Sequence, residues 1–519
     1  MNSANQPTPA SGYSPTSTGA GERQLDSTTA KPLRQRSLPA PIAILGVPFD
    51  IVTMAGTLEL IEEMIISRKP HYAATANVDF VVQAMEDIEL RRILLDAHLV
   101  LADGMPLVWA SRWLGNPLPE RVTGSDLVPR LLCEAERKGW RVFFLGGSEQ
   151  SVAIAAEKSL KKHPNLKIVG AYSPPFKSLL EMDHEDIVRR VCAASPDVLL
   201  VAFGCPKQEK WINMHFRKLG VPLSVGVGAT IDFLAGTMKR APVWMQRTGT
   251  EWIYRMLQEP RRLFRRYGTD LWIFSRAIFK QWWHMRTGRA ASRTADAPAA
   301  LTILGKSLQV LELPSRLDAE AVRSNSEQWN KLAEADRHLL VDMSKIEFID
   351  STGAGLLVRF ERRMRGSNRQ ILLLAPSKAA QGALTLMRIT DLLPTAPNLE
   401  AAREMIARRI AEQATVVTPK LPGAEAALAW QGEIVAANAD EVWRSTEQCL
   451  DRLAGNASTL TINLAGVRFM DSTGVGLMVR ARKQADLRGI EVQFLAPSPA
   501  VQNVLRTLRL LTMISGRET

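Results

Sequence analysis

The chain has 519 residues, and at roughly 150 residues per domain this length predicts about three domains. The hydrophobic content of 46% and charged content of 23% are ordinary for a globular protein, which excludes a wholly disordered or collagen-like chain. The four cysteines stand far apart without a Cys-x-x-Cys pair, which argues against a disulfide scaffold and against a structural zinc site.

The chain begins with a segment of low hydrophobicity, residues 1–41, which is rich in Ser, Thr, Pro, Gly and Ala. We expect a disordered tail there, because so few apolar side chains could be buried. Short apolar runs then alternate with amphipathic stretches over residues 42–236. We expect strands at Tyr72–Ala76, Leu99–Ala102, Arg141–Leu145, Lys167–Val169, Val198–Phe203 and Leu223–Gly226, and helices at Val78–Ala97 and Asp126–Lys138. This alternation predicts an α/β domain with a Rossmann-like parallel sheet that is covered on both faces.

Two polar residues directly follow predicted strands. Asn77 comes after the strand that ends at Ala76, and Asp103 comes after the strand that ends at Ala102. The carboxyl ends of parallel strands form the edge where open α/β sheets bind ligands, and a carboxylate at that edge can act as a general base. The alternative is structural, with Asn77 as a helix cap and Asp103-Gly104 as a turn.

Two further strand ends carry groups suited to an anion or a sugar. Gly146-Gly147 precedes a predicted helix, so it can either admit a phosphate or simply make a tight turn. Lys207 and Gln208 could hold a sugar or diphosphate, or could begin the next helix. The acidic stretch Asp183–Asp186 indicates the solvated start of a helix and not a metal site, so we expect no metal and no cofactor.

A basic and aromatic segment, residues 237–293, follows the first domain and is called the appendage below. Gly236–Arg293 holds thirteen Lys/Arg against three acidic residues, a difference of +10 in a chain whose net charge is +12, and five of the twelve Trp. Basic helix faces beside Trp and Phe suit an anionic membrane surface; the alternatives are a core helix and a nucleic-acid patch. We favour the membrane surface and expect no nucleic-acid partner. Pro260 should bend or break the first appendage helix.

An internal repeat occupies the rest of the chain. Val341–Phe360 aligns without gaps to Ile462–Ala481, and 13 of the 37 positions over Val341–Ser377 are identical. Each copy has the pattern strand, Asp-Ser-Thr-Gly, helix, strand, helix. We expect two small α/β domains at 301–400 and 415–519, joined to the appendage by the small-residue linker Ala290–Ala300.

The first domain resembles the WecG/TagA/CpsF family of glycosyltransferases. The resemblance runs in family order over about Ile42–Tyr267. Its carrying stretches are TANVDF (Thr75–Phe80), ADGMPLVWASRWLG (Ala102–Gly115), ERVTGSDLVP (Glu120–Pro129), FFLGG (Phe143–Gly147), FGCPKQEKW (Phe203–Trp211), GVGATIDFLAG (Gly226–Gly236), KRAP (Lys239–Pro242) and EWIYRMLQEPRRLFRRY (Glu251–Tyr267).

The resemblance implies transfer of a sugar from a UDP-sugar to a polyprenyl-diphosphate-linked sugar, with inversion and without a metal. It implies Asp103 as the general base, with Thr75 and Asn77 lining the pocket and the arginines of the appendage near the diphosphate. The expected substrate-binding residues are Thr75, Asn77, Gly146, Gly147, Lys207, Gln208, Arg240, Arg255, Arg262 and Arg265.

The two copies resemble the STAS domain of anti-anti-sigma factors through FIDSTGAGLLV and FMDSTGVGLMV. The resemblance implies phosphorylation at Ser351 and Ser472, and a surface around each serine that docks a kinase or an anti-sigma-like protein. The Asp and Gly of each motif also suffice to cap and pack a helix, which is the structural alternative.

These patterns together predict a peripheral glycosyltransferase on the cytoplasmic, inner face of the cell membrane, acting in exopolysaccharide or cell-envelope glycan synthesis. The rival hypothesis is a catalytically silent scaffold that acts through its STAS domains.

Overall fold

The computed structural model describes residues 39–510, apart from 249, 259, 292–298, 305–306, 326–327, 330, 333–335, 366–368, 391–392, 414–424, 454–458 and 508–509. The predicted disordered tail, up to residue 38, and most of the predicted linker at Ala290–Ala300 lie outside this range.

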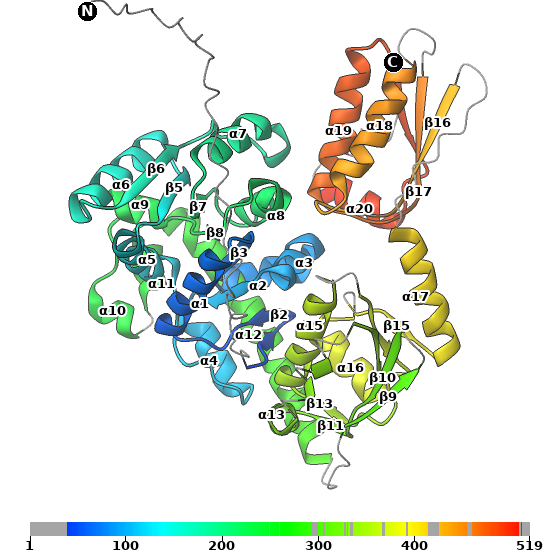
Figure 1. Cartoon of the computed structure of the whole chain (residues 1–519). Helices are drawn as coiled ribbons and strands as arrows, with labels where there is room; N and C mark the ends of the chain where they lie inside the picture. The colour runs from blue at the N-terminus through cyan, green and yellow to red at the C-terminus, as the bar shows by residue number, and fades with distance from the viewer. Residues whose placement is uncertain are drawn as a thin grey trace, which may run out of the picture. The chain divides into compact units, whose positions relative to one another are not determined.

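The first domain is built on a six-stranded sheet in which every pairing is parallel, with the strand order β4-β3-β8-β7-β5-β6. Figure 1 shows helices on both sides of this sheet. The strands are β3 (His71–Ala76), β4 (Leu99–Ala102), β5 (Arg141–Gly146), β6 (Lys167–Tyr172), β7 (Val198–Ala202) and β8 (Leu223–Gly226), preceded by the antiparallel pair β1 (Ile42–Ile44) and β2 (Val47–Phe49). The predicted Rossmann-like parallel α/β fold is therefore confirmed.

Both faces of the sheet are buried, which explains the short apolar runs in the sequence. Along β4, Leu99 and Leu101 belong to one hydrophobic cluster, whereas Val100 and Ala102 belong to another. Successive side chains of a strand point to opposite faces, so each face has a core of its own. The helices that cover the sheet are α1 (Met54–Ser67), α2 (Val78–Glu86), α3 (Ile88–Asp96), α4 (Met105–Trp113), α5 (Gly124–Lys138), α6 (Glu149–Lys162), η1 (Leu179–Glu181), α7 (His184–Ala194), α8 (Lys207–Leu219) and α9 (Thr230–Ala235).

One helix prediction was wrong in this domain. The single helix expected over Val78–Ala97 is two helices, because Asp87 has extended backbone angles and its side chain accepts a hydrogen bond from the Leu90 N–H at 3.0 Å. Asp87 therefore caps α3 and ends α2.

The acidic stretch Asp183–Asp186 is a helix start, as predicted. Asp183 accepts a hydrogen bond from the Asp186 N–H and caps α7.

The appendage is helical, with α10 (Val243–Thr248), α11 (Glu251–Gln258) and α12 (Pro260–Ala291). Pro260 begins α12, so the predicted break at this proline is confirmed. From Pro260, α12 runs without a break through Tyr267 and Gly268.

The two carboxy-terminal domains are small α/β units, and the strand, DSTG, helix, strand, helix order is confirmed in both (Figure 1). The first contains β9 (Ala300–Leu304), β10 (Leu308–Glu312), β11 (Arg316–Leu317), α13 (Ala319–Ser324), β12 (His338–Asp342), β13 (Phe348–Ile349), α15 (Ser351–Arg365), β14 (Ile371–Leu374), α16 (Lys378–Leu386), β15 (Thr395–Ala396) and α17 (Leu399–Gln413). The second contains β16 (Glu425–Ile434), α18 (Ala439–Leu453), β17 (Thr459–Met470), α19 (Ser472–Asp486), β18 (Glu491–Leu495) and α20 (Pro499–Thr507).

Candidate active site

A pocket lies at the carboxyl edge of the sheet, where β3 and β4 end side by side. Ala76 and Ala102 are paired in register, and the Asp103 N–H donates to the Ala76 carbonyl at 2.8 Å. Asn77 and Asp103 therefore emerge next to each other, and both line the pocket. The sequence prediction that these two residues meet at the sheet edge agrees with this geometry.

The Asp103 carboxylate is oriented by the start of α5. Its Oδ2 accepts a hydrogen bond from the Gly124 N–H at 3.2 Å, and α5 begins at Gly124. The unpaired N–H groups of a helix start carry partial positive charge and favour a carboxylate. Gly104 has φ +154°, which lets the chain turn directly from β4 into α4. The Gly124 N–H thus helps to orient the Asp103 side chain, which is partly exposed and lines the pocket.

Asn77 has both of the roles that the sequence left open. Its side chain accepts from the Phe80 N–H at 3.2 Å and caps α2, and it also lines the pocket. Thr75 is different, because it is 5% exposed and its hydroxyl donates to the Gly226 carbonyl at 3.0 Å. Thr75 joins β3 to β8 beneath the pocket and does not line it.

The structure accounts for the Gly-Gly turn after β5 by packing alone. Gly146 and Gly147 have φ of +99° and +77°, and a Cβ on Gly146 would lie 2.6 Å from the Ala202 carbonyl oxygen. Ser148 then caps α6 by accepting from the Ser151 N–H at 3.0 Å. Neither glycine lines the pocket that holds Asp103.

Gln208 ties two loops at the same sheet edge. It is 2% exposed, and its Oε1 accepts from the N–H groups of Gly204 at 3.2 Å and Gly228 at 3.1 Å. Its Nε2 donates to Glu209, whose pKa is raised to about 8 by burial. Lys207 is outside the pocket and its ammonium donates to the Lys177 carbonyl at 2.5 Å. Gln208 therefore fixes the loops after β7 and β8.

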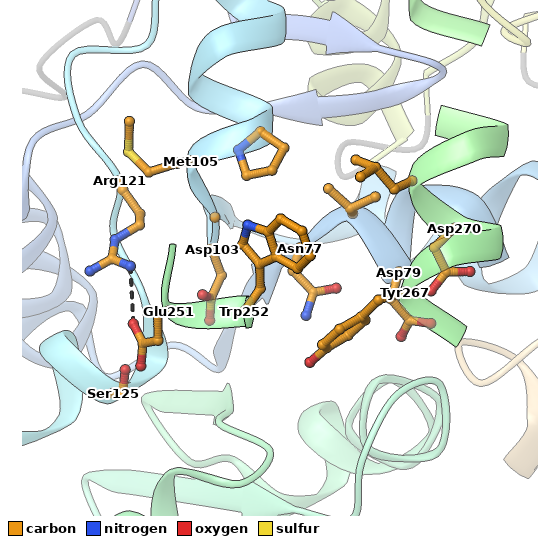
Figure 2. A pocket seen from close by; sticks show the side chains of 14 residues that line it. Asn77, Asp79, Asp103, Met105, Arg121, Ser125, Glu251, Trp252, Tyr267 and Asp270 are labelled. Atoms are coloured by element: carbon orange, nitrogen blue, oxygen red, sulfur yellow. Dashed lines mark hydrogen bonds and ion pairs between the residues drawn. The ribbon is translucent and has the colours of Figure 1, made fainter. Parts of the chain in front are cut away.

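The appendage closes the pocket from the side opposite the sheet. Figure 2 shows Trp252 beside Asp103 and Asn77, with the ion pair of Arg121 and Glu251 to one side and Tyr267 and Asp270 to the other. Trp252 and Glu251 come from α11, and Tyr267 and Asp270 come from α12. The residues that line the pocket are Asn77, Val78, Asp79, Asp103, Gly104, Met105, Pro106, Arg121, Ser125, Glu251, Trp252, Tyr267, Asp270 and Leu271.

One group of ion pairs joins the appendage to the first domain near Asp103. Arg121 pairs with Glu251 at 3.1 Å and with Asp126 at 3.2 Å, while Arg240 pairs with Asp126. Burial alone would raise the pKa of Asp126. The Arg240 guanidinium, with Thr123 and Arg121, outweighs burial and lowers this pKa. Arg240 was predicted to bind substrate, whereas in the structure its side chain joins the appendage to the first turn of α5, at Ser125 and Asp126.

A second group lies at the other end of the pocket. Arg266 pairs with Asp79, with Nε 2.9 Å from Oδ1, and reaches Asp270 at 4.0 Å. Burial, followed by the nearby Asp79 carboxylate, raises the pKa of Asp270 to about 6. The side chains of Arg255, Arg262 and Arg265 lie outside the described part of the chain, so their predicted substrate contacts stay predictions.

Sequence reasoning missed Arg121, Glu251, Trp252 and Asp270 as pocket residues. Arg121 and Glu251 each stand within a stretch that resembles the family, yet they are 130 positions apart and pair only through the tertiary fold. Asp270 follows a run of arginines and has no local signature. No residue spacing in the sequence predicts these contacts.

The appendage helix α12 has a buried face and an exposed aromatic face. Phe274, Ile278 and Met285 are 4%, 1% and 6% exposed, whereas Trp272 and Trp283 are 71% and 56% exposed. The core-helix alternative therefore holds for one face, and the other face leaves large aromatic side chains uncovered. Within the described residues, every helix is too short or too polar to cross a bilayer.

Both STAS serines are buried at helix starts. Asp350 accepts from the Thr352 and Gly353 N–H groups, and Asp471 accepts from the Thr473 and Gly474 N–H groups. The predicted capping role of these acids is confirmed. Close packing at the motif glycines is confirmed as well, because a Cβ on Gly353 would lie 2.0 Å from the Leu317 carbonyl oxygen.

The two serines differ in their surroundings. Ser472 donates its hydroxyl to Glu89 at 2.7 Å and its N–H to the other oxygen of the same carboxylate at 2.7 Å. Lys210 pairs with Glu89 at 2.8 Å. Ser351 is 0% exposed, and among the described residues its hydroxyl has no hydrogen-bond partner.

The parallel sheet, its polar pocket and the closing appendage define an α/β enzyme domain of the kind that binds a substrate at the carboxyl ends of its strands. The chain belongs to the glycosyl transferase WecG/TagA/CpsF family, which matches residues 42–288, and it carries STAS domains at 304–402 and 415–519.

The chain is similar to an N-acetylglucosaminyldiphosphoundecaprenol N-acetyl-beta-D-mannosaminyltransferase of Staphylococcus aureus, with 30% identity over 48% of this chain and 97% of that protein. A protein of the same description from Bacillus spizizenii is 33% identical over 37% of this chain and 74% of its own length. The solved structure of the anti-sigma factor antagonist SpoIIAA in its unphosphorylated form matches 21% of this chain and 95% of that chain, at 19% identity and a TM-score of 0.19.

Proposed function

We propose that the protein transfers a sugar from a UDP-sugar to a polyprenyl-diphosphate-linked sugar, with inversion, in exopolysaccharide or cell-envelope glycan synthesis. The observation that carries this proposal is the placement of Asp103 in a pocket that the family's sheet edge and the appendage enclose together. The relatives' description makes N-acetylmannosamine the first donor sugar to test, and N-acetylglucosaminyl-diphospho-undecaprenol the first acceptor.

In the proposed reaction, the Asp103 carboxylate takes the proton of the acceptor hydroxyl. The acceptor oxygen then attacks C1 of the donor sugar, and the bond between C1 and the UDP oxygen breaks on the opposite side. The configuration at C1 inverts, and UDP leaves with the bonding electron pair. The hydrogen bond from the Gly124 N–H to Oδ2 keeps the carboxylate in one orientation during this transfer.

The leaving diphosphate needs positive charge, which we assign to the protein and not to a metal. Arg255, Arg262 and Arg265 belong to the two helices that close the pocket. Gly146, Gly147, Lys207 and Gln208 follow the next strands of the same sheet edge, where the donor nucleotide would bind; Gln208 acts there by holding the loops of Gly204 and Gly228.

We place the enzyme as a peripheral protein on the inner face of the cell membrane, because its lipid-linked acceptor is there. The exposed aromatic side chains of α12 lie among basic residues, which is the composition that binds an anionic bilayer surface.

The test of the proposal is transfer in vitro. Full-length protein is incubated with a panel of UDP-sugars and N-acetylglucosaminyl-diphospho-undecaprenol in detergent, and the product is analysed by mass and by the anomeric configuration of the new linkage. We expect one added sugar of inverted configuration, with the same rate when EDTA is present. No product with any donor would contradict the transferase proposal and favour the silent scaffold.

For the STAS domains we propose regulation through Ser472, with a kinase or anti-sigma-like protein as the partner. A phosphate on Ser472 would place about two negative charges against the buried Glu89 carboxylate, and this repulsion would separate α19 from α3. Transfer rates of Ser472→Glu and Ser472→Ala should then differ by several-fold. Equal transfer rates and equal partner binding by both variants would contradict this switch. The Glu and Ala variants of Ser351 are compared in the same way.

A further inference from the structure

An apolar groove lies between α4 and α12, next to the candidate active site. It is lined from α4 by Trp109, Ala110 and Trp113, and from α12 by Leu271, Phe274 and Ile278. Of the residues that line it, only Arg112 and Ser275 have polar side chains, apart from the N–H groups of the tryptophans. A groove of this composition suits an aliphatic ligand.

The groove adjoins the pocket. Pro106, Trp252 and Leu271 line both cavities, so the two share a wall made by α4, α11 and α12. A ligand whose polar end lies at Asp103 would therefore extend its apolar part along α4 and α12 without leaving protein surface.

The exposed residues around the groove point to the source of the ligand. Trp109 and Trp113 are 41% and 66% exposed, and Trp272 and Phe279 on the outer side of α12 are 71% and 57% exposed. By helical spacing, Leu271 and Ser275 lie between the buried face of α12 and its exposed aromatic face. The groove thus runs beside the face that we place on the bilayer. The hydrocarbon chain of a lipid that leaves the bilayer could enter the groove directly.

We infer that this groove binds the first isoprene units of the acceptor lipid and guides the diphosphate-linked sugar to Asp103. The inference rests on the proposed function, because the acceptor is the ligand that joins an apolar chain to a sugar. It makes Trp109 and Trp113 positioning residues that determine acceptor affinity and take no part in the chemistry.

The experiment compares two acceptors that differ only in the lipid: N-acetylglucosaminyl-diphosphate carried on undecaprenol and on a short alkyl chain, both in detergent micelles. Ser275→Trp fills the groove and Trp113→Ala removes part of its wall. Both positions are exposed, so little stability should be lost, and thermal unfolding checks this. Leu160→Ala, at an exposed position of α6 in the sheet domain, is the control.

We expect the groove variants to raise KM for the undecaprenyl acceptor about tenfold. For the same variants, kcat and the KM for the short acceptor should stay within about twofold of the wild-type values. The control should behave as wild type with both acceptors. Equal effects of a groove variant on both acceptors would overturn the inference. The inference would also be overturned if a groove variant changed the oligomeric state and this change explained the higher KM, because a second copy of the chain would then cover the groove.

A separate readout distinguishes failure of this inference from failure of the proposed function. If the wild type transfers no sugar to either acceptor, the proposed reaction is wrong, and the groove is then tested by binding alone. Undecaprenyl diphosphate with a photoreactive group in its second isoprene unit should label peptides from α4 and α12, and Ser275→Trp should abolish that labelling. Labelling of other peptides, or no labelling, would overturn the inference that the groove binds the lipid, whether or not the protein transfers sugar.

Discussion

The two halves of the pocket are held in different ways. The sheet half, with Asn77 and Asp103, is fixed by backbone pairing between β3 and β4 and by hydrogen bonds to the starts of α2 and α5. The appendage half, with Trp252 and Asp270, is joined to it by the buried apolar face of α12 and by ion pairs, among them Arg121–Glu251 and Arg266–Asp79. The first half supplies a rigid reactive group, and the second supplies a wall whose attachment depends in part on charge and therefore on salt and pH.

The largest expected effect is on the sheet half. Asp103→Asn keeps the shape of the side chain and the hydrogen bond from Gly124 but cannot accept the acceptor proton, so kcat should fall by roughly 10²- to 10⁴-fold. Release of UDP in the presence of acceptor measures this. Glu185→Gln, at an exposed position of α7, is the control and should match the wild type. An Asp103→Asn enzyme with wild-type turnover would remove this carboxylate from the base role.

A smaller effect is expected when the appendage half is loosened. Arg266→Met removes the ion pair with Asp79, whose carboxylate is 9% exposed in the pair, and should lower kcat/KM about tenfold because α12 leaves the pocket more often. Hydrogen exchange should increase in α11 and α12 and stay unchanged in β3 and β4. Arg276→Met, an exposed arginine on the same helix, is the matched control, and an identical loss with both variants would contradict a specific role for the pair.

The outer face of the appendage should contribute to membrane binding and not to chemistry. Trp272→Ala with Trp283→Ala should weaken binding to liposomes that contain anionic lipid by about three- to tenfold, since both side chains are more than half exposed. Transfer to a micellar acceptor should not change. Leu160→Ala, on α6 of the sheet domain, serves as the control; liposome binding that the double variant leaves unaltered would place the membrane contact elsewhere.

Much of the sheet half could be predicted from the sequence because its signals are local. The strands Leu99–Ala102 and Leu223–Gly226 were predicted with their observed bounds, since each is a short apolar run that ends at a turn residue. The break at Asp87 was missed because the apolar pattern continues through it, and only the side-chain cap separates α2 from α3.

For the appendage half, the sequence predicted the kind of helix from its composition but not its contacts. Its excess of arginine and tryptophan indicated a basic amphipathic helix, but which residues face the pocket depends on partners more than a hundred positions away. Arg266 pairs with Asp79, and Glu251 pairs with Arg121, and neither partner is marked by local spacing. Arg240, which was predicted to bind substrate, instead pairs with the protein's own carboxylates, Asp126 and Glu251.

The smallest expected effect comes from Asp270, and it tests whether the appendage half responds to pH. Its pKa is raised to about 6 in the folded protein, from an ordinary value near 4, by burial and by the neighbouring Asp79. The folded state therefore binds the proton more tightly than the unfolded state, so this group's stabilising contribution is complete below about pH 4 and is lost as the pH rises through about 6. Because the group is partly solvated, the change in the stability of α12 should be about 1 kcal/mol or less. Hydrogen exchange of α12 should report faster opening at pH 7.5 than at pH 5, after correction for intrinsic exchange rates. In Asp270→Asn, which does not titrate, that difference should shrink; if it persists unchanged, another group in the appendage controls the opening.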